Sequence, residues 1–169
     1  MKFILIDRIT SIEPPSRITA TKCLSLAEEY LADHFPTFPV MPGVLMLEAM
    51  VQTAGWLVRV TQDFSRSMIV LEEAKNITYK SFVTPGGTME VIAEAVEIGE
   101  ASSDFKVSGR RGSDEIVKAR LKLRHYNLAD RDPQWADTDD RLISDARKRF
   151  DLLGGPAAMK SAGVLAQVR

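Results

Sequence analysis

The chain has 169 residues, a formal net charge of −1 and 45% hydrophobic residues, as expected for one globular domain of ordinary composition. So small a net charge excludes a general attraction to nucleic acid or to an anionic membrane surface. The single cysteine, Cys23, excludes an internal disulfide and favours a reducing compartment. The first apolar run ends at Asp7 and Arg8, too early for a signal peptide, so we expect a cytoplasmic protein.

Six apolar segments bounded by turn residues predict β-strands. They are residues 3–13, 17–25, 68–80, 89–98, 102–110 and 115–126. An irregularity is expected near Glu73 in the third segment. In the last segment, apolar residues from Val117 to Leu123 alternate strictly with basic residues from Lys118 to Arg124. This alternation favours an antiparallel sheet with one face in solvent.

A long helix is predicted to start at Pro42-Gly43, after a proline-rich connection over residues 26–42. The segment from Gly43 to Val60 is apolar on nearly all sides and has 18 residues, close to the lower limit for crossing a bilayer. Because Glu48 would be costly in lipid, we expect a buried core helix and no membrane insertion. One such helix among five to six antiparallel strands predicts an α+β fold with the sheet wrapped around the helix.

The last part of the chain, residues 127–169, is interpreted as an extension of a domain over residues 1–126. Within the extension, residues 137–153 predict a helix whose start is capped by Asp137 or Thr138. Its apolar side consists of Leu142, Ile143, Ala146 and Phe150. A Gly-Gly-Pro sequence then ends the helix, and the remainder is expected to be loosely ordered.

The candidate chemistry lies at His34, in the proline-rich connection, and at Glu48, fourteen residues later on the helix. A neutral imidazole can accept a proton at cellular pH, and apolar surroundings would keep the carboxyl of Glu48 protonated, so that it can act as an acid. The free N–H of Gly43 at the helix start would polarise a carbonyl oxygen. Gln52, one helical turn after Glu48, would orient the carboxyl group. A base, an acid and an oxyanion donor together suit proton abstraction beside a carbonyl, followed by loss of a hydroxyl.

Each of these residues also has a purely structural interpretation. A histidine in a loop is commonly solvated, and a glutamate on a core helix can pair with a buried partner. Gly43 can serve the backbone alone. A second histidine, His125, has no evident partner in the sequence, and we assign it no role.

Together, these residues form a recognisable pattern. The segment HFPTFPVMPGVLMLEAMVQTAG resembles the active-site signature of the β-hydroxyacyl-acyl carrier protein dehydratases of fatty acid synthesis. On either side, LIDRITSIEPPSRITATK resembles the family's first hairpin and EEAKNITYKSFVTPGGTMEV its strand-turn-strand after the helix, so the resemblance covers residues 3–126. It implies a hot-dog fold, in which a strongly curved antiparallel sheet surrounds one central helix.

The resemblance also implies an activity. A hydro-lyase of this kind removes water from a (3R)-hydroxyacyl-acyl carrier protein thioester to give the trans-2-enoyl thioester. His34 would remove the α-proton, Glu48 of the other protomer would protonate the leaving hydroxyl, and the N–H of Gly43 would hold the thioester oxygen. The implied partners are an acyl carrier protein bearing the acyl-phosphopantetheine and a second copy of the chain, in a homodimer that can assemble into a trimer of dimers. No metal or organic cofactor is implied.

The acyl chain of such a substrate would lie in a tunnel between protomers. Its candidate binding residues are Phe38, Met41, Val44, Leu45, Gln52 and Phe82. Ordinary core packing explains the apolar ones equally well. Two other functions stay open: a hot-dog thioesterase, in which Glu48 would activate water, and a non-catalytic partner subunit.

The chain departs from the family pattern in three places. Asp33 and Thr37 stand where the family has glycines, so we expect the loop around His34 to sit differently. Asp33 would raise the basicity of His34 or repel acidic partners. The family's N-terminal helical segment is missing, and we expect the extension over residues 127–169 to cover the surface that this segment protects.

Overall fold

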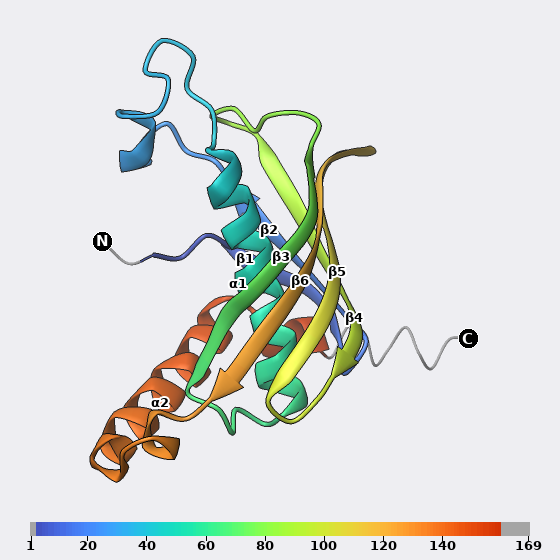
Figure 1. The fold of residues 1–169 in the computed structure, drawn as a ribbon. Helices are drawn as coiled ribbons and strands as arrows, with labels where there is room; N and C mark the ends of the chain where they lie inside the picture. The colour runs from blue at the N-terminus through green and yellow to red at the C-terminus, as the bar shows by residue number, and fades with distance from the viewer. Residues whose placement is uncertain (1–2, 160–169) are drawn as a thin grey trace.

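The computed structural model describes residues 3–159 and shows an α+β fold with six strands and two long helices in that range (Figure 1). The strands are β1 (Arg8–Glu13), β2 (Arg17–Cys23), β3 (Met68–Tyr79), β4 (Thr88–Ile98), β5 (Ser102–Arg111) and β6 (Asp114–Tyr126). They form one antiparallel sheet in the order β1-β2-β4-β5-β6-β3, so β1 and β3 are its edges. All six predicted strands are confirmed.

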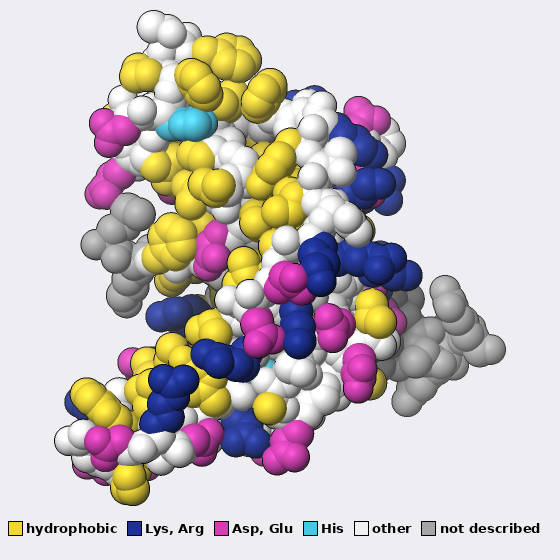
Figure 2. All heavy atoms as spheres, in the orientation of Figure 1, with side chains coloured by type: hydrophobic (Ala, Val, Ile, Leu, Met, Phe, Trp, Pro, Cys, Tyr) yellow, Lys and Arg dark blue, Asp and Glu magenta, His cyan; other side chains and the backbone are white. Residues whose placement is uncertain are grey.

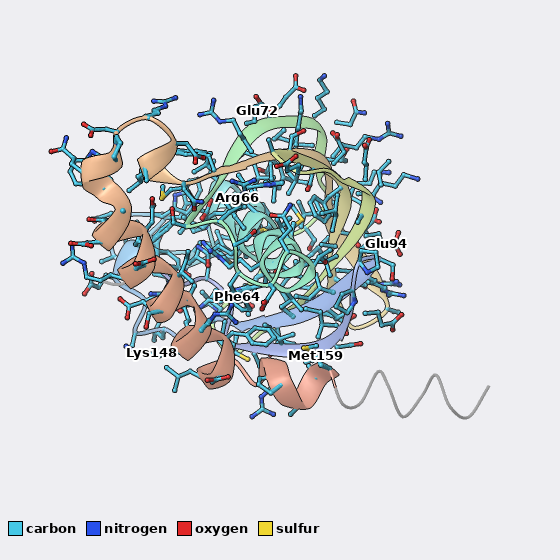
Figure 3. The ribbon with its side chains drawn as sticks, turned by 90° about the horizontal axis from the view of Figure 1, so that it is seen from below. Phe64, Arg66, Glu72, Glu94, Lys148 and Met159 are labelled. Carbon is cyan, nitrogen blue, oxygen red and sulfur yellow. The ribbon has the colours of Figure 1, made fainter. Side chains whose placement is uncertain are left out.

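Helix α1 (Gly43–Thr61) lies in the concave side of this sheet, and Figure 3 looks along the helix with the strands curving around it. By length and composition α1 could span a membrane, but half of its apolar window is buried inside the fold. Its buried residues pack against the inward side chains of the strands, among them Val117 and Leu123 of β6. The prediction of a core helix surrounded by a sheet is therefore confirmed, and this is the hot-dog arrangement that the resemblance implies.

Two details of the strands differ from or refine the prediction. The first strand is shorter than expected, because residues 3–6 do not pair with β2. The N–H of Leu5 donates instead to Oε1 of Gln52 at 2.9 Å, and Leu5 and Ile6 are buried against the core. In β3, the pairing with β6 shifts register between Leu71 and Glu73, where the sequence predicted an irregularity.

The extension begins with two short 3-10 helices, η2 (Leu128–Asp130) and η3 (Pro133–Trp135), and continues as α2 (Ala136–Leu152). Helix α2 lies along the open side of the curved sheet, next to α1 (Figures 1 and 3). Phe150 of α2 packs its ring 6.0 Å from that of Trp56 on α1 and 5.6 Å from that of Phe64.

The helix predicted over residues 137–153 is therefore present, but its predicted cap is wrong. The capping position is Trp135, without a side-chain hydrogen bond, because α2 continues directly from η3. The helix ends before Gly154, as predicted, and residues 155–159 form another short helical turn. The rest of the segment expected to be loosely ordered, residues 160–169, lies outside the described range.

A buried carboxylate attaches α2 to the domain. Asp139 accepts hydrogen bonds from the hydroxyl of Ser67, just before β3, and from the N–H groups of Leu128 (3.0 Å) and Ala129 (2.9 Å). Burial by itself raises the pKa of Asp139, but the three hydrogen bonds outweigh it and hold the pKa below its usual range.

We expect Asp139→Ala to lower the free energy of unfolding by about 2–4 kcal/mol, because three buried donors lose their acceptor at once. Urea titration followed by the fluorescence of Trp56 and Trp135 would measure the change. The control is Asp140→Ala, since the neighbouring carboxylate is exposed. Equal stability of the two variants would contradict this account of how α2 is attached.

His125 has partners that the sequence did not reveal. It is buried at the end of β6, with Nδ1 3.0 Å from the carbonyl oxygen of Glu100 and Nε2 2.9 Å from the hydroxyl of Ser103. A carbonyl only accepts, so Nδ1 carries the proton and Nε2 accepts from Ser103. Burial lowers the pKa of His125, and the nearby charge of Arg66 acts in the same direction.

The protein is therefore expected to lose stability on acidification. Below about pH 6.5 the unfolded chain binds a proton at His125 that the folded chain still excludes, so stability falls from that pH down to the lower, folded pKa. His125→Gln should weaken this dependence, and should cost about 1–3 kcal/mol at neutral pH through the disturbed hydrogen bonds. Thermal unfolding of both proteins between pH 7.5 and pH 5 is the measurement; parallel pH curves would contradict the assignment.

Candidate active site

The loop that carries His34 is fixed at both ends by contacts to other segments of the fold. At its beginning, Nζ of the buried Lys22 on β2 lies 2.5 Å from Oε1 of Glu28. At its end, the N–H of Met41 donates to the carbonyl oxygen of Val83 at 2.9 Å. Between these contacts the chain protrudes above the start of α1 (Figure 1). One anchor on β2 and one on the connection between β3 and β4 thus hold a loop that forms no regular structure over most of its length.

The backbone around His34 differs from the expectation at Thr37. Residues 35–38 form a tight turn, in which the N–H of Phe38 donates a hydrogen bond to the carbonyl oxygen of Phe35 at 2.8 Å. The left-handed residue is Phe35, with φ 48°, and Thr37 does not adopt this conformation. The β-carbon of Thr37 therefore meets no backbone strain. Asp33 is exposed and makes no ion pair with His34 within the described residues, so the structure shows no direct effect of Asp33 on the imidazole.

His34 faces a small apolar cavity of about 270 Å³, here called the His34 hollow. It is lined by His34, Phe35, Val40, Met41, Gly43, Met46, Tyr79, Ser81 and Phe82. The imidazole is half-buried, and its ring lies 4.5 Å from that of Phe35. Four of the residues expected at the site are therefore brought together: His34, Met41, Gly43 and Phe82.

Gly43 is the first residue of α1, and its N–H has no hydrogen-bond partner among the described residues. The N–H groups of Leu45 and Met46 donate to the carbonyl oxygen of Pro42, so Gly43 and Val44 hold the free donors of the helix start, and this end is attractive to negative charge. The ring of Tyr79 covers Gly43 closely: a β-carbon at this position would lie 3.0 Å from Cε1 of Tyr79. A β-carbon at position 43 would push the ring of Tyr79 aside by a few tenths of an ångström, so this contact favours glycine.

Glu48 lies at a second cavity of about 290 Å³, the Glu48 hollow, formed by α1, the N-terminal segment, the start of β3 and α2. The α1 residues that line it are Glu48, Val51, Gln52, Gly55, Trp56 and Arg59. Nε2 of Gln52 donates to Oε1 of Glu48 at 3.0 Å, the contact that the helical spacing predicted. Glu48 is only half-buried in a single chain, so the fully apolar surroundings expected for it are not present there.

The far end of the Glu48 hollow carries positive charge. Arg59 donates to the carbonyl oxygens of Arg66 (3.0 Å) and Ser67 (3.2 Å), and Arg149 of α2 lines the same cavity. Burial, and then the charge of Arg149, lower the pKa of Arg59 to about 10. Arg59 therefore stays charged at neutral pH.

The two hollows lie on different faces of α1. Met46 lines the His34 hollow and Glu48 the other, and two residues along an α-helix turn the side chain by about 200°. Within residues 3–159, no hydrogen bond and no common cavity joins His34 to Glu48. One chain thus holds the candidate base and the candidate oxyanion donor in one place, and the candidate acid with the amide of Gln52 in another.

The other candidate binding residues lie in different parts of the structure. Phe38 packs edge-on against Phe82, with 6.3 Å between ring centroids, at the margin of the His34 hollow. Val44 is 70% exposed and lines neither hollow, and Leu45 packs against the core. Tyr79 was missed, because only the pairing of β3 with β6 brings it to the start of α1.

The remaining described surface adds little chemistry. A third cavity, of about 440 Å³, lies on the solvent side of the sheet and is lined by charges of both signs, among them Arg120 and Glu94. Within residues 3–159, no group of three or more His, Cys, Asp or Glu side chains is placed to hold a metal ion.

Comparisons with known proteins agree with the fold and with the motif. Residues 1–112 match the family described as the FabA-like domain. The chain is 38% identical over 124 residues to the 3-hydroxyacyl-[acyl-carrier-protein] dehydratase FabZ of Thiobacillus denitrificans. This alignment covers 72% of this chain and 84% of that protein. The FabZ protein of Rickettsia bellii is 34% identical over 125 residues, or 71% and 86% of the two chains.

The solved dehydratase heterocomplex ApeI:P of Xenorhabdus doucetiae has a similar fold. It superposes with a TM-score of 0.64 at 14% identity, over 75% of this chain and 86% of that one. At this identity the likeness concerns the fold alone, and it confirms the hot-dog architecture.

Proposed function

The chain belongs to the FabA-like family of 3-hydroxyacyl-[acyl-carrier-protein] dehydratases, and we propose that two copies of it together build each active site. It is a hydro-lyase that removes water from a 3-hydroxyacyl thioester in fatty acid synthesis. The observation that carries the proposal is the separation of the two hollows on α1, because a base and an acid that act on one substrate must meet.

In the proposed reaction, His34 accepts the α-proton of a (3R)-hydroxyacyl thioester. The electron pair of the broken C–H bond moves towards the thioester oxygen, where the N–H of Gly43 stabilises the charge. When the pair returns, the bond between C3 and its oxygen breaks, and Glu48 of the other copy protonates the departing hydroxyl to give water and the trans-2-enoyl thioester. A proton then passes from His34 to Glu48 through solvent and restores both groups.

The surface around the hollows supports the assembly of two copies. Large apolar side chains are exposed there: Phe35, Phe38, Val44, Tyr79 and Phe82. Figure 2 shows hydrophobic side chains gathered over this end of the molecule, whereas charged ones dominate the outer strands. A contiguous apolar patch on one chain marks a surface that a partner covers. The outer edge of β3 is also unpaired within the described residues, and a second β3 would complete it.

A partner on this surface would also complete the burial of Glu48, which a single chain leaves incomplete. Half-buried in a single chain, the carboxyl group would lose its remaining contact with water beneath the apolar patch of the other copy.

The proposal extends to the other features of the chain. Residues 1–126 form the hot-dog domain, and residues 127–169 form an extension that covers part of α1 through α2. The FabZ relatives act on 3-hydroxyacyl groups carried by acyl carrier protein, and the same carrier is the proposed partner here. A cytoplasmic location fits the single cysteine, Cys23. The substrate-binding residues proposed are Met41, Phe38 and Phe82 near His34, with Gln52 near Glu48.

The function is tested by incubating the protein with 3-hydroxyacyl thioesters of several chain lengths and following two signals. Dehydration forms a conjugated enoyl thioester that absorbs in the ultraviolet, whereas hydrolysis of the thioester releases a free thiol. We expect the absorbing product without thiol. Release of thiol without the enoyl product would favour the thioesterase, and neither signal would favour the non-catalytic subunit.

A further inference from the structure

Tyr79 lies in the His34 hollow, but the reaction as described above does not use it. Its partner across the sheet is Val117 of β6, which is fully buried against α1. Residues directly opposite each other in an antiparallel pair point to the same face of the sheet. Tyr79 therefore projects inwards, towards the start of α1, from the edge strand of the sheet.

The phenol is held beside Gly43. A β-carbon on Gly43 would lie 3.0 Å from Cε1 of Tyr79 and 3.2 Å from Cζ, the carbon that bears the hydroxyl. The phenol ring and Gly43 thus lie side by side at the start of the helix, and both residues line the His34 hollow. No hydrogen-bond partner occupies the hydroxyl of Tyr79 among the described residues, so it is available to a ligand.

The rest of the His34 hollow offers few donors. Phe35, Val40, Met41, Met46 and Phe82 are apolar, which leaves the imidazole, the hydroxyl of Ser81 and the phenol as its polar side chains. Burial raises the pKa of Tyr79, so the phenol keeps its proton at neutral pH and acts as a donor. A donor in an apolar cavity stabilises developing negative charge more strongly than it does in water.

We propose that the hydroxyl of Tyr79 donates a hydrogen bond to the thioester oxygen of the bound acyl group, as a second oxyanion donor next to the N–H of Gly43. The inference rests on the proposed function and names a further catalytic residue of the same site. The proton stays on the phenol throughout. Because the thioester oxygen becomes more negative when His34 removes the α-proton, the bond strengthens in the transition state and acts mainly on kcat.

Tyr79→Phe removes the hydroxyl and keeps the ring that packs on Gly43. We expect kcat for the 3-hydroxyacyl thioester to fall roughly 10²-fold, the usual effect of losing one oxyanion donor, with KM and the melting temperature little changed. The control is Tyr126→Phe, a tyrosine of β6 whose ring lies under Arg124, 5.1 Å away, and outside the hollow. A kcat of Tyr79→Phe within threefold of wild type would overturn the proposal.

A second measurement does not require turnover. The N-acetylcysteamine thioester of a saturated acyl group lacks the 3-hydroxyl and cannot react, and the infrared band of its carbonyl reports hydrogen bonds to the oxygen. We expect a lower frequency when it is bound to the wild type and a return to higher frequency in Tyr79→Phe. The same frequency in both proteins would overturn the proposal. If the wild type failed to dehydrate hydroxyacyl thioesters, the proposed function would fall, whereas the infrared comparison would still test Tyr79.

Discussion

His34→Ala and Glu48→Gln are each expected to reduce kcat by about 10²–10⁴-fold, the usual contribution of a positioned base or acid. Both variants should fold, because each side chain is only half-buried and His34 makes no hydrogen bond within the described residues. Glu48→Gln also keeps a group that can bond to the amide of Gln52. Turnover of a 3-hydroxyacyl thioester is the measurement, with melting temperatures to confirm folding.

The matched control for these variants is Glu29→Gln, which removes an exposed carboxylate from the loop that carries His34. It should leave kcat unchanged. Activity of either variant within threefold of wild type would remove that residue from the mechanism.

A mixture of the two inactive variants should regain activity. If each site takes His34 from one copy and Glu48 from the other, a mixed dimer contains one complete site and one site that lacks both groups. Random exchange between two-fold symmetric dimers then restores about one quarter of the wild-type activity per chain. This increase from near zero is the largest effect that the proposed assembly predicts.

The measurement requires the two variants to be refolded together, or produced in the same cells, so that subunits exchange. The control is a mixture of His34→Ala with the double variant His34→Ala/Glu48→Gln, which cannot assemble a complete site. If the first mixture stayed as inactive as the second while the subunits had exchanged, both groups would have to act within one chain, and the shared site would be excluded.

The sequence predicted the fold well because its strongest signals are local. The alternation from Val117 to Leu123 and the apolar segment after Gly43 depend only on neighbours along the chain, and both elements appear where expected. The contact between Gln52 and Glu48 is local in the same sense, since it spans one helical turn. The cap of α2 was wrong because the helix-start signal lies earlier, at Asp132 and Pro133 of η3, and α2 continues from that turn.

The candidate site was predicted less completely, because parts of it depend on distant segments or on another chain. Tyr79 reaches Gly43 only through the pairing of β3 with β6, which the sequence does not specify residue by residue. The burial expected for Glu48 is absent from a single chain, and a helical pattern cannot distinguish a face covered by the sheet from one covered by a second copy. The partners of His125 lie in the turn between β4 and β5 and on β5 itself, and only the pairing of β5 with β6 brings them to the imidazole.

The open edge of β3 has a consequence for the life of the protein in the cell. Leu71 and Ile77 are exposed along this strand, and such an edge can recruit any other extended chain into aggregates. Glu73 and Lys75, 2.8 Å apart on the same strand, oppose indiscriminate pairing by their charges. If two copies pair along β3 as proposed, newly made chains that have not yet found a partner are the ones at risk of precipitation or proteolysis.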